Sequence, residues 1–296
     1  MFKNFDELKN TVSTKPRTLV VAAAHDSHTL EAVYLAAVKY SIGYIFVGDR
    51  EKIILESSKL GYSPDAGSII DITNDEECAR TAVSLVKKGE ADALMKGLLD
   101  TGVLLSAVLD RETGIKDSGV LSHLAVLEVP AYTKLIGITD GGMIPNPTLE
   151  QKVDIVKNST GFFRSIGYTR PKIAALCASE TVNPKIQETV DASELQKMCN
   201  RGELGDCLLE GPLSFDISVS RESAMIKKYS GDVGGDADIL LVPAISVGNI
   251  LAKGLMYWAG AKMAGCILGA KTPIVLTSRG GTTEEKLLSI MLSMIA

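Results

Sequence analysis

Short apolar runs alternate with amphipathic segments through the first third of the chain. Residues 18–24 (TLVVAAA) are rich in small and β-branched side chains, and residues 30–40 (LEAVYLAAVKY) have apolar positions at helical spacing. This order predicts a strand, a loop and a helix. We predict the same order three more times: strand 44–47 with helix 49–60, strand 68–72 with helix 75–88, and strand 91–95 with helix 102–109. Such alternation predicts a mainly parallel sheet covered on both faces.

The pattern changes between residues 116 and 139. Two apolar runs, 121–129 (LSHLAVLEV) and 131–139 (AYTKLIGIT), are separated only by Pro130, which leaves no room for a crossover helix. We therefore predict an antiparallel pair of strands. The following segment, 140–148 (DGGMIPNPT), is dense in Gly, Pro and Asn and predicts a loop that crosses to a second domain.

A second αβ series follows the loop. It begins with a predicted helix over 149–166. We predict further strands at 172–178, 207–210, 239–242 and 273–277, and further helices at 183–201, 218–229, 249–264 and 284–295. The fold class is therefore α/β.

Composition narrows the class of protein. The 296 residues, 46% of them hydrophobic, suit one large or two mid-sized domains, and we favour two. The net charge of −5 provides no basic field for nucleic acid or an anionic membrane, and no run of about 18 apolar residues predicts a membrane span. The five scattered cysteines and three histidines show no metal-ligand spacing, so we expect no metal site and a cytoplasmic location.

The sharpest candidate for chemistry is the segment 278–283 (SRGGTT), between a predicted buried strand and the last helix. Gly280 and Gly281 allow backbone N–H groups to converge at the positive end of that helix, where phosphate binds well. Arg279 adds a planar double donor and Ser278 a neutral hydroxyl donor. The alternative is structural: Thr282 or Thr283 caps the helix and the glycines only form the turn.

Two further candidates follow predicted strands. In the segment 95–101 (MKGLLDT), Lys96 can direct an ammonium at an anion, Gly97 permits close approach, and Thr101 can cap the next helix. Asn249 and Lys253 lie four residues apart on one face of a predicted helix. The alternatives are a surface lysine for Lys96 and an N-cap for Asn249.

Several ordered blocks resemble one enzyme family. These blocks are 94–109 (LMKGLLDTGVLLSAVL), 118–130 (SGVLSHLAVLEVP), 138–159, 210–220 (EGPLSFDISVS), 235–255 and 264–286 (AGCILGAKTPIVLTSRGGTTEEK). Together they are similar to the phosphate acetyl/butyryltransferases, and the first two, with the turn 140–143 (DGGM), resemble the butyryl branch more than the acetyl branch.

The resemblance implies a function and a fold. We expect a phosphotransacylase that exchanges a butyryl, isobutyryl or isovaleryl group between coenzyme A and phosphate, with no tightly bound cofactor. The implied fold has two α/β domains around a cleft, similar to isocitrate and isopropylmalate dehydrogenases, in a homodimer. The first domain would comprise residues 1–137 plus 270–296, and the second residues 138–269.

The resemblance also implies catalytic roles. Ser278 would stabilise the transition state, Arg279 would contact the substrate, and Glu285 would act as base toward the thiol, although Glu284 beside it is an alternative. We further assign Asn146, in the loop 140–148, to substrate binding. Phosphate acetyltransferase activity remains an alternative, as do an NAD-dependent decarboxylating dehydrogenase of similar fold and a non-catalytic protein that binds acyl-CoA.

Overall fold

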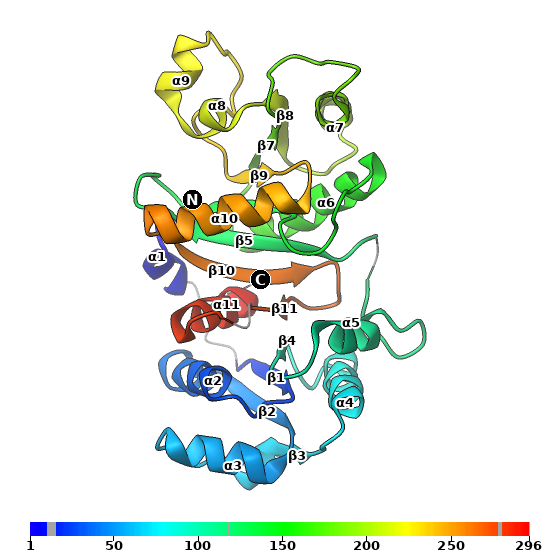
Figure 1. The fold of residues 1–296 in the computed structure, drawn as a ribbon, viewed down its shortest axis with the longest axis vertical. Coiled ribbons are helices and arrows are strands. Elements are labelled where there is room, and N and C mark those ends of the chain that lie inside the picture. Colours follow the sequence, from blue (N-terminus) through cyan, green and yellow to red (C-terminus); the bar gives the residue numbers. More distant parts are fainter. Residues whose placement is uncertain (11–15, 118, 278–279, 296) are drawn as a thin grey trace. The chain divides into compact units, whose positions relative to one another are not determined.

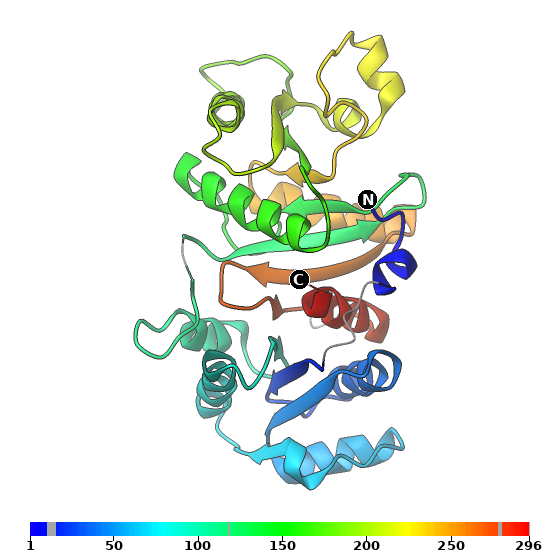
Figure 2. The same ribbon diagram turned by 180° about the vertical axis from the view of Figure 1, so that it is seen from behind.

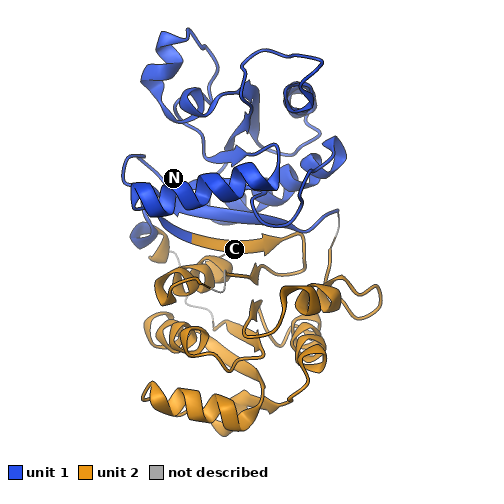
Figure 3. Ribbon diagram, in the orientation of Figure 1, with its two compact units in different colours: residues 1–7, 119–263 blue, residues 8–118, 264–296 orange. Residues whose placement is uncertain are grey.

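A computed structural model describes residues 1–10, 16–117, 119–277 and 280–295. The chain separates into two compact units, coloured in Figure 3: unit 1 comprises residues 1–7 and 119–263, and unit 2 comprises residues 8–118 and 264–296. These boundaries fall at 118/119 and 263/264, whereas we predicted domain boundaries at 137/138 and 269/270. The difference arises because strands 122–128 and 136–139 pair with each other, which keeps residues 119–137 in unit 1. The assignment of domains itself stays a prediction.

Unit 2 is built on a mainly parallel sheet. Its strand order is β3-β2-β1-β4-β11-β10, and the pairs from β3 to β11 are parallel, whereas β10 and β11 are antiparallel. The bounds are β1 Thr18–Ala22, β2 Gly43–Gly48, β3 Ile69–Asp71, β4 Ala93–Lys96, β10 Lys262–Leu268 and β11 Ile274–Val275. The chain runs from β1 outward to β3 and then returns to place β4 on the other side of β1, so the strand order reverses between β1 and β4.

The helices of unit 2 follow the strands as predicted (Figure 1). They are α2 Ser27–Tyr40, α3 Arg50–Lys59, α4 Asp75–Lys88, α5 Thr101–Leu109 and α11 Thr283–Ile295, with a 3-10 turn at Ala66–Ser68. A short helix, α1 Phe5–Lys9, begins in unit 1 and ends in unit 2. Side-chain caps set several starts: Asp26, Asp49 and Asn74 accept from backbone N–H groups three residues on. Helices α2 and α11 pack on one apolar core with β1, β2 and β4.

The strands of unit 1 are also of mixed direction and follow the order β5-β6-β9-β7-β8. The strands are β5 Ser122–Glu128, β6 Ile136–Thr139, β7 Lys172–Leu176, β8 Leu208–Leu213 and β9 Ile239–Leu241. Strands β5 and β6 are antiparallel, which confirms the pair predicted around Pro130, and the other pairs are parallel.

Helices cover both faces of this sheet. They are α6 Leu149–Ser165, α7 Gln187–Asn200, α8 Phe215–Val219, α9 Arg221–Ile226 and α10 Ile245–Ala259. Helix α10, orange, lies toward the viewer beside β5 in Figure 1, and α6, green, lies toward the viewer in the reversed view of Figure 2.

Two predicted helices differ from the structure. The helix predicted over 218–229 is two short helices that meet at Ser220, whose side chain caps the second. The helix predicted over 249–264 begins earlier, at Ile245, and ends at Gly260, which has a left-handed φ of 65°. The residues that follow form strand β10, which we did not predict, because a short apolar run does not distinguish a buried strand from a helix.

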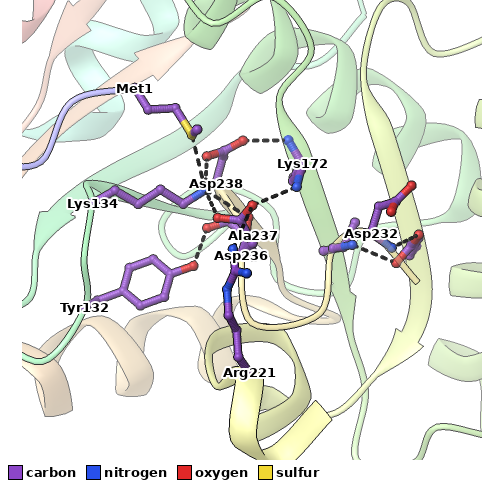
Figure 4. Close-up of polar contacts among 11 residues, drawn as sticks. Met1, Tyr132, Lys134, Lys172, Arg221, Asp232, Asp236, Ala237 and Asp238 are labelled. Atoms are coloured by element: carbon purple, nitrogen blue, oxygen red, sulfur yellow. Dashed lines mark hydrogen bonds and ion pairs between the residues drawn. The ribbon is translucent and has the colours of Figure 1, made fainter. Parts of the chain in front are cut away.

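An ionic cluster connects the starts of β6, β7 and β9 (Figure 4). The Lys134 ammonium lies 2.9 Å from Asp236 and also binds Asp238, while Lys172 Nζ donates to Asp236 Oδ2 at 2.7 Å. Tyr132 donates its hydroxyl to the Ala237 carbonyl oxygen at 2.7 Å. Each buried charge thus has a partner of opposite sign, which is the usual condition for burying it, so the cluster is structural.

Candidate active site

The turn after β4 holds Lys96 in a buried position. Lys96 is the last residue of β4 and only 9% exposed, and its Nζ donates to the carbonyl oxygens of Gly97 at 3.0 Å and Leu99 at 2.9 Å. Gly97 lies against β1, because a Cβ there would contact Ala23 O and approach Ala22 O to 2.8 Å. Only glycine allows this approach, so the backbone of the turn is pressed onto the end of β1.

The start of α11 brings three polar residues together. Thr282 Oγ1 accepts from Glu285 N at 3.1 Å, so the alternative that a threonine caps this helix is confirmed for Thr282. Thr283 instead donates its hydroxyl to Glu31 Oε2 at 2.7 Å. Lys286 reaches back to the end of β11, where its Nζ donates to Thr277 Oγ1 at 3.0 Å.

A cavity of about 230 Å³ lies within unit 2 where these segments meet. It is lined by Asp26, Lys96, Gly97, Leu98, Leu99, Thr277 and Lys286. The lining comes from the carboxyl ends of β1, β4 and β11, which are neighbours in the sheet. The cavity therefore lies where the strand order reverses, which is where ligands bind in open α/β sheets.

The charges around this cavity favour an anion. Two ammonium groups, those of Lys96 and Lys286, line it together with one carboxylate, and Asp26 Oδ1 already accepts from Thr29 N at 2.9 Å as the cap of α2. Leu98 is 58% exposed although it lines the cavity, so apolar surface is available beside the charged groups. The lining suits a small ligand with an anionic part and an apolar part.

Glu285 and Glu284 differ in their surroundings. Glu284 is exposed, whereas Glu285 is 8% exposed in the first turn of α11. Burial raises the pKa of the Glu285 carboxyl above its ordinary value, although the Lys286 charge and the Thr282 N–H lower it in part. A carboxylate with a raised pKa is a stronger base, so Glu285 is the better suited of the two to accept a proton.

The structure leaves part of the predicted site untested. Ser278 and Arg279 lie outside the described residues. Gly280 is exposed, with no atom within 4 Å of the place where a Cβ would lie, and Gly281 is buried.

One predicted role in the turn after β4 is wrong. Thr101 is the first residue of α5 and does not cap it, because Asp100, with extended φ and ψ of −68° and 142°, occupies the cap position. Thr101 is partly exposed, and its assignment to binding stays a prediction.

The remaining predicted residues belong to unit 1. Asn146 is exposed in the loop before α6, and Asn249 and Lys253 are exposed on α10. Asn249 does not cap a helix, because α10 begins at Ile245 after Ala244, and its Nδ2 donates to Gly141 O at 3.4 Å. Their roles in binding stay predictions.

Sequence reasoning missed Lys286, Asp26 and Thr277. A signal for Lys286 was present, because a cation in the first turn of a helix opposes the helix dipole and needs another reason to be there. Asp26 and Thr277 gave no such signal, because their proximity depends on the pairing of β1, β4 and β11.

Helices of the described residues are all too short or too polar to cross a lipid bilayer.

Residues 74–294 match the model of a protein family described as Phosphate acetyl/butaryl transferase. A probable phosphate butyryltransferase of Bacillus subtilis (strain 168) is 45% identical over 283 residues, covering 95% of this chain and 94% of that protein. A phosphate acetyltransferase of Thermotoga maritima is 40% identical over 290 residues, covering 98% of each chain. Among solved structures, a branched-chain phosphotransacylase from Enterococcus faecalis V583 is 34% identical, with a TM-score of 0.84, and covers 94% of this chain and 98% of that one.

Proposed function

The chain belongs to the phosphate acetyl/butyryltransferase family and is a phosphotransacylase, and we propose that it transfers butyryl, isobutyryl or isovaleryl groups between coenzyme A and phosphate. The likeness to a probable phosphate butyryltransferase and to a branched-chain phosphotransacylase supports this acyl class. The exposed Leu98 beside the cavity is consistent with it, because a short branched chain gains from apolar contact.

The observation that carries the proposal is the cavity at the carboxyl ends of β1, β4 and β11. It combines the ammonium groups of Lys96 and Lys286 with apolar surface, and the buried Glu285 precedes Lys286 on the same helix turn. An acyl phosphate needs these properties at once: positive charge for its phosphoryl oxygens, an apolar wall for its acyl chain, and a base for the incoming thiol.

We propose a direct transfer without a covalent enzyme intermediate. In the direction of thioester synthesis, the coenzyme A sulfur attacks the carbonyl carbon of the acyl phosphate, a carbon–sulfur bond forms, and the carbon–oxygen bond to phosphate breaks. Glu285 takes the thiol proton, while Ser278 stabilises the developing oxyanion and Arg279 contacts the substrate. Lys96 and Gly97 hold the departing phosphate, whose negative charge the ammonium group offsets.

The other binding assignments are also proposals. Gly280 and Gly281 would present backbone N–H groups to the substrate, and Thr101 its hydroxyl. Asn146, Asn249 and Lys253 would contact coenzyme A, which we treat as a substrate together with phosphate and not as a resident cofactor.

One assay tests the proposed function. Purified protein is mixed with phosphate and, in separate reactions, acetyl-, butyryl-, isobutyryl- and isovaleryl-coenzyme A, and the loss of thioester absorbance is followed. We expect phosphate-dependent loss, fastest with a four- or five-carbon acyl group. Absence of phosphate-dependent loss with every thioester would refute the proposal.

The same assay decides the second candidate, phosphate acetyltransferase activity, which the 40% identity to the Thermotoga maritima protein favours. A higher kcat/KM for acetyl-coenzyme A than for the larger thioesters would establish it.

We also propose that the enzyme is a cytoplasmic homodimer. Apolar side chains line one exposed stripe of α10, with Ile250 72%, Tyr257 80% and Trp258 92% exposed. Large apolar surface of this kind is characteristic of protein–protein contact sites, and a second copy of the chain is the partner we propose.

A further inference from the structure

Four lysines are less than a tenth exposed in the described part of the chain, and they fall into two pairs. Lys134 and Lys152 lie in unit 1, and both form ion pairs with aspartates. Lys134 pairs with Asp236 and Asp238, and Lys152 pairs with Asp191 at 2.6 Å. Lys96 and Lys286 lie in unit 2 and line the cavity described above.

Lys286 differs from the paired lysines in the partners of its charge. Lys286 is 6% exposed, and among the described residues the one hydrogen-bond partner of its ammonium is a neutral oxygen, Thr277 Oγ1 at 3.0 Å. No described carboxylate lies within ion-pair distance of its ammonium, although its charge acts on the neighbouring Glu285 carboxyl and lowers the pKa of that group in part. A buried ammonium is costly without a counter-ion, so a site of this kind is suited to receive an anion.

The direction of the side chain indicates where that anion lies. Helical side chains lean toward the N-terminus of their helix, and Lys286 accordingly extends back from α11 to the end of β11. Its ammonium therefore reaches the cavity that Lys96 also lines, at the edge of the sheet where ligands bind.

The size of the cavity narrows the ligand. Its volume of about 230 Å³ is below the roughly 300–1,000 Å³ of pockets that enclose drug-sized ligands, so it suits a phosphate with a short acyl chain better than the whole of coenzyme A. A phosphate dianion also offers several oxygens, enough for hydrogen bonds to both ammonium groups.

We infer that Lys286 binds the phosphate that takes part in the reaction, as inorganic phosphate in one direction and as the phosphoryl group of the acyl phosphate in the other. This inference rests on the proposed function. It assigns Lys286 a direct contact with the reacting group itself, beside Lys96, and it distinguishes the reacting phosphate from the phosphates of coenzyme A.

The test compares Lys286→Met with Lys286→Arg, and uses Lys39→Met, a change of an exposed lysine on α2, as matched control. Methionine replaces the apolar stem of the side chain and lacks only the terminal ammonium group, so the packing of the stem is retained while the charge and its hydrogen bond to Thr277 are lost. We expect Lys286→Met to raise the KM for inorganic phosphate about 10–100-fold, the range for one hydrogen bond to a charged group, and to change the KM for acyl-coenzyme A less than about threefold. Lys286→Arg should recover part of the loss, and Lys39→Met should match the wild type.

A second measurement is made on wild-type protein and uses a variant only to assign one resonance. The side-chain Nζ resonance of Lys286 in wild-type protein, assigned by its absence in Lys286→Arg, should shift when inorganic phosphate is added and not when coenzyme A is added. Equal KM values for phosphate in Lys286→Met and wild type, a rise confined to the KM for acyl-coenzyme A, or a resonance that moves only with coenzyme A would each overturn the inference. Wild-type protein without phosphate-dependent thioester loss would instead refute the proposed function, and the resonance would still report whether Lys286 binds phosphate.

Discussion

Replacing Gly97 by alanine tests whether the close contact between β4 and β1 shapes the cavity. A Cβ at this position would contact Ala23 O and lie 2.8 Å from Ala22 O. Both obstacles are backbone atoms that cannot rotate away. The same two carbonyl groups accept hydrogen bonds from Gly97 N at 2.8 Å and Leu98 N at 2.9 Å, so the clash can be relieved only by stretching these bonds.

The cost can be built up from these contacts. Inserting a methyl group into a closely packed site costs about 1–3 kcal/mol. Each of the two weakened hydrogen bonds adds about 0.5–1.5 kcal/mol. We therefore expect Gly97→Ala to lower the free energy of unfolding by about 2–6 kcal/mol, out of the roughly 5–15 kcal/mol of an ordinary protein.

Gly102→Ala is the matched control. Gly102 lies in α5, five residues from Gly97, and no atom lies within 4 Å of the place where its Cβ would be. Alanine at a helical position should leave stability unchanged or raise it by about 0.5–1 kcal/mol.

Urea unfolding and the thioester assay measure both effects. Because the turn carries Lys96 into the cavity, its displacement should also lower turnover, by about 100-fold for a shift near 1 Å. A Gly97→Ala protein within about 0.5 kcal/mol of wild type and with full turnover would refute the account of this turn.

Three further predictions concern separate features. First, Glu285→Gln should lower kcat by about 10²–10⁴-fold and remove the acidic limb of the pH–rate profile. In the wild type this limb should lie above the ordinary glutamate range, because burial raises the pKa of Glu285. An unchanged limb in the variant would exclude Glu285 as the base. Second, although burial raises the pKa of Asp236, hydrogen bonds from Lys172 and Lys134 hold that pKa below its ordinary value. The ionised Asp236 carboxylate therefore stabilises the folded protein above about pH 4, and this contribution is lost as pH falls through the folded-state pKa. Asp236→Asn should therefore cost about 1.5–3 kcal/mol in urea unfolding at pH 7 and progressively less at acidic pH, and a cost independent of pH would contradict this. Third, Trp258→Asp should weaken self-association by about 10–100-fold in analytical ultracentrifugation, whereas Val38→Asp, at an exposed apolar position on α2, should not; equal association of both variants would place the contact elsewhere.

Elements bounded by local signals were predictable from sequence. The helix predicted over 75–88 coincides with α4, because Asn74 caps it, acidic residues fill its first turn, and Gly89 ends it with a φ of 77°. The antiparallel pair around Pro130 followed from a connection too short for a helix.

Elements that depend on residues distant in the chain were not predictable from the sequence. The run that forms β10 is apolar enough for either a helix or a strand, and its pairing with β11 decided the outcome. The break at Ser220 was likewise not predicted, because the pattern of apolar positions around it is typical of one continuous helix.

The candidate site divides in the same way. The sequence by itself indicated Lys96 and Gly97 after a buried strand, and a helix start capped by Thr282 or Thr283, because strand ends and helix starts are defined by residues close together in the chain. Only the tertiary structure decided that Lys286 is buried, that Glu285 and not Glu284 is shielded from water, and that Asp26, Lys96 and Thr277 line one cavity. Burial, and the pKa shift that follows from it, result from the packing of β1, β4, β11 and α11. These elements are far apart in the chain, since Thr18 and Lys286 are separated by 268 positions. The periodicity within one segment contains no information about such distant contacts.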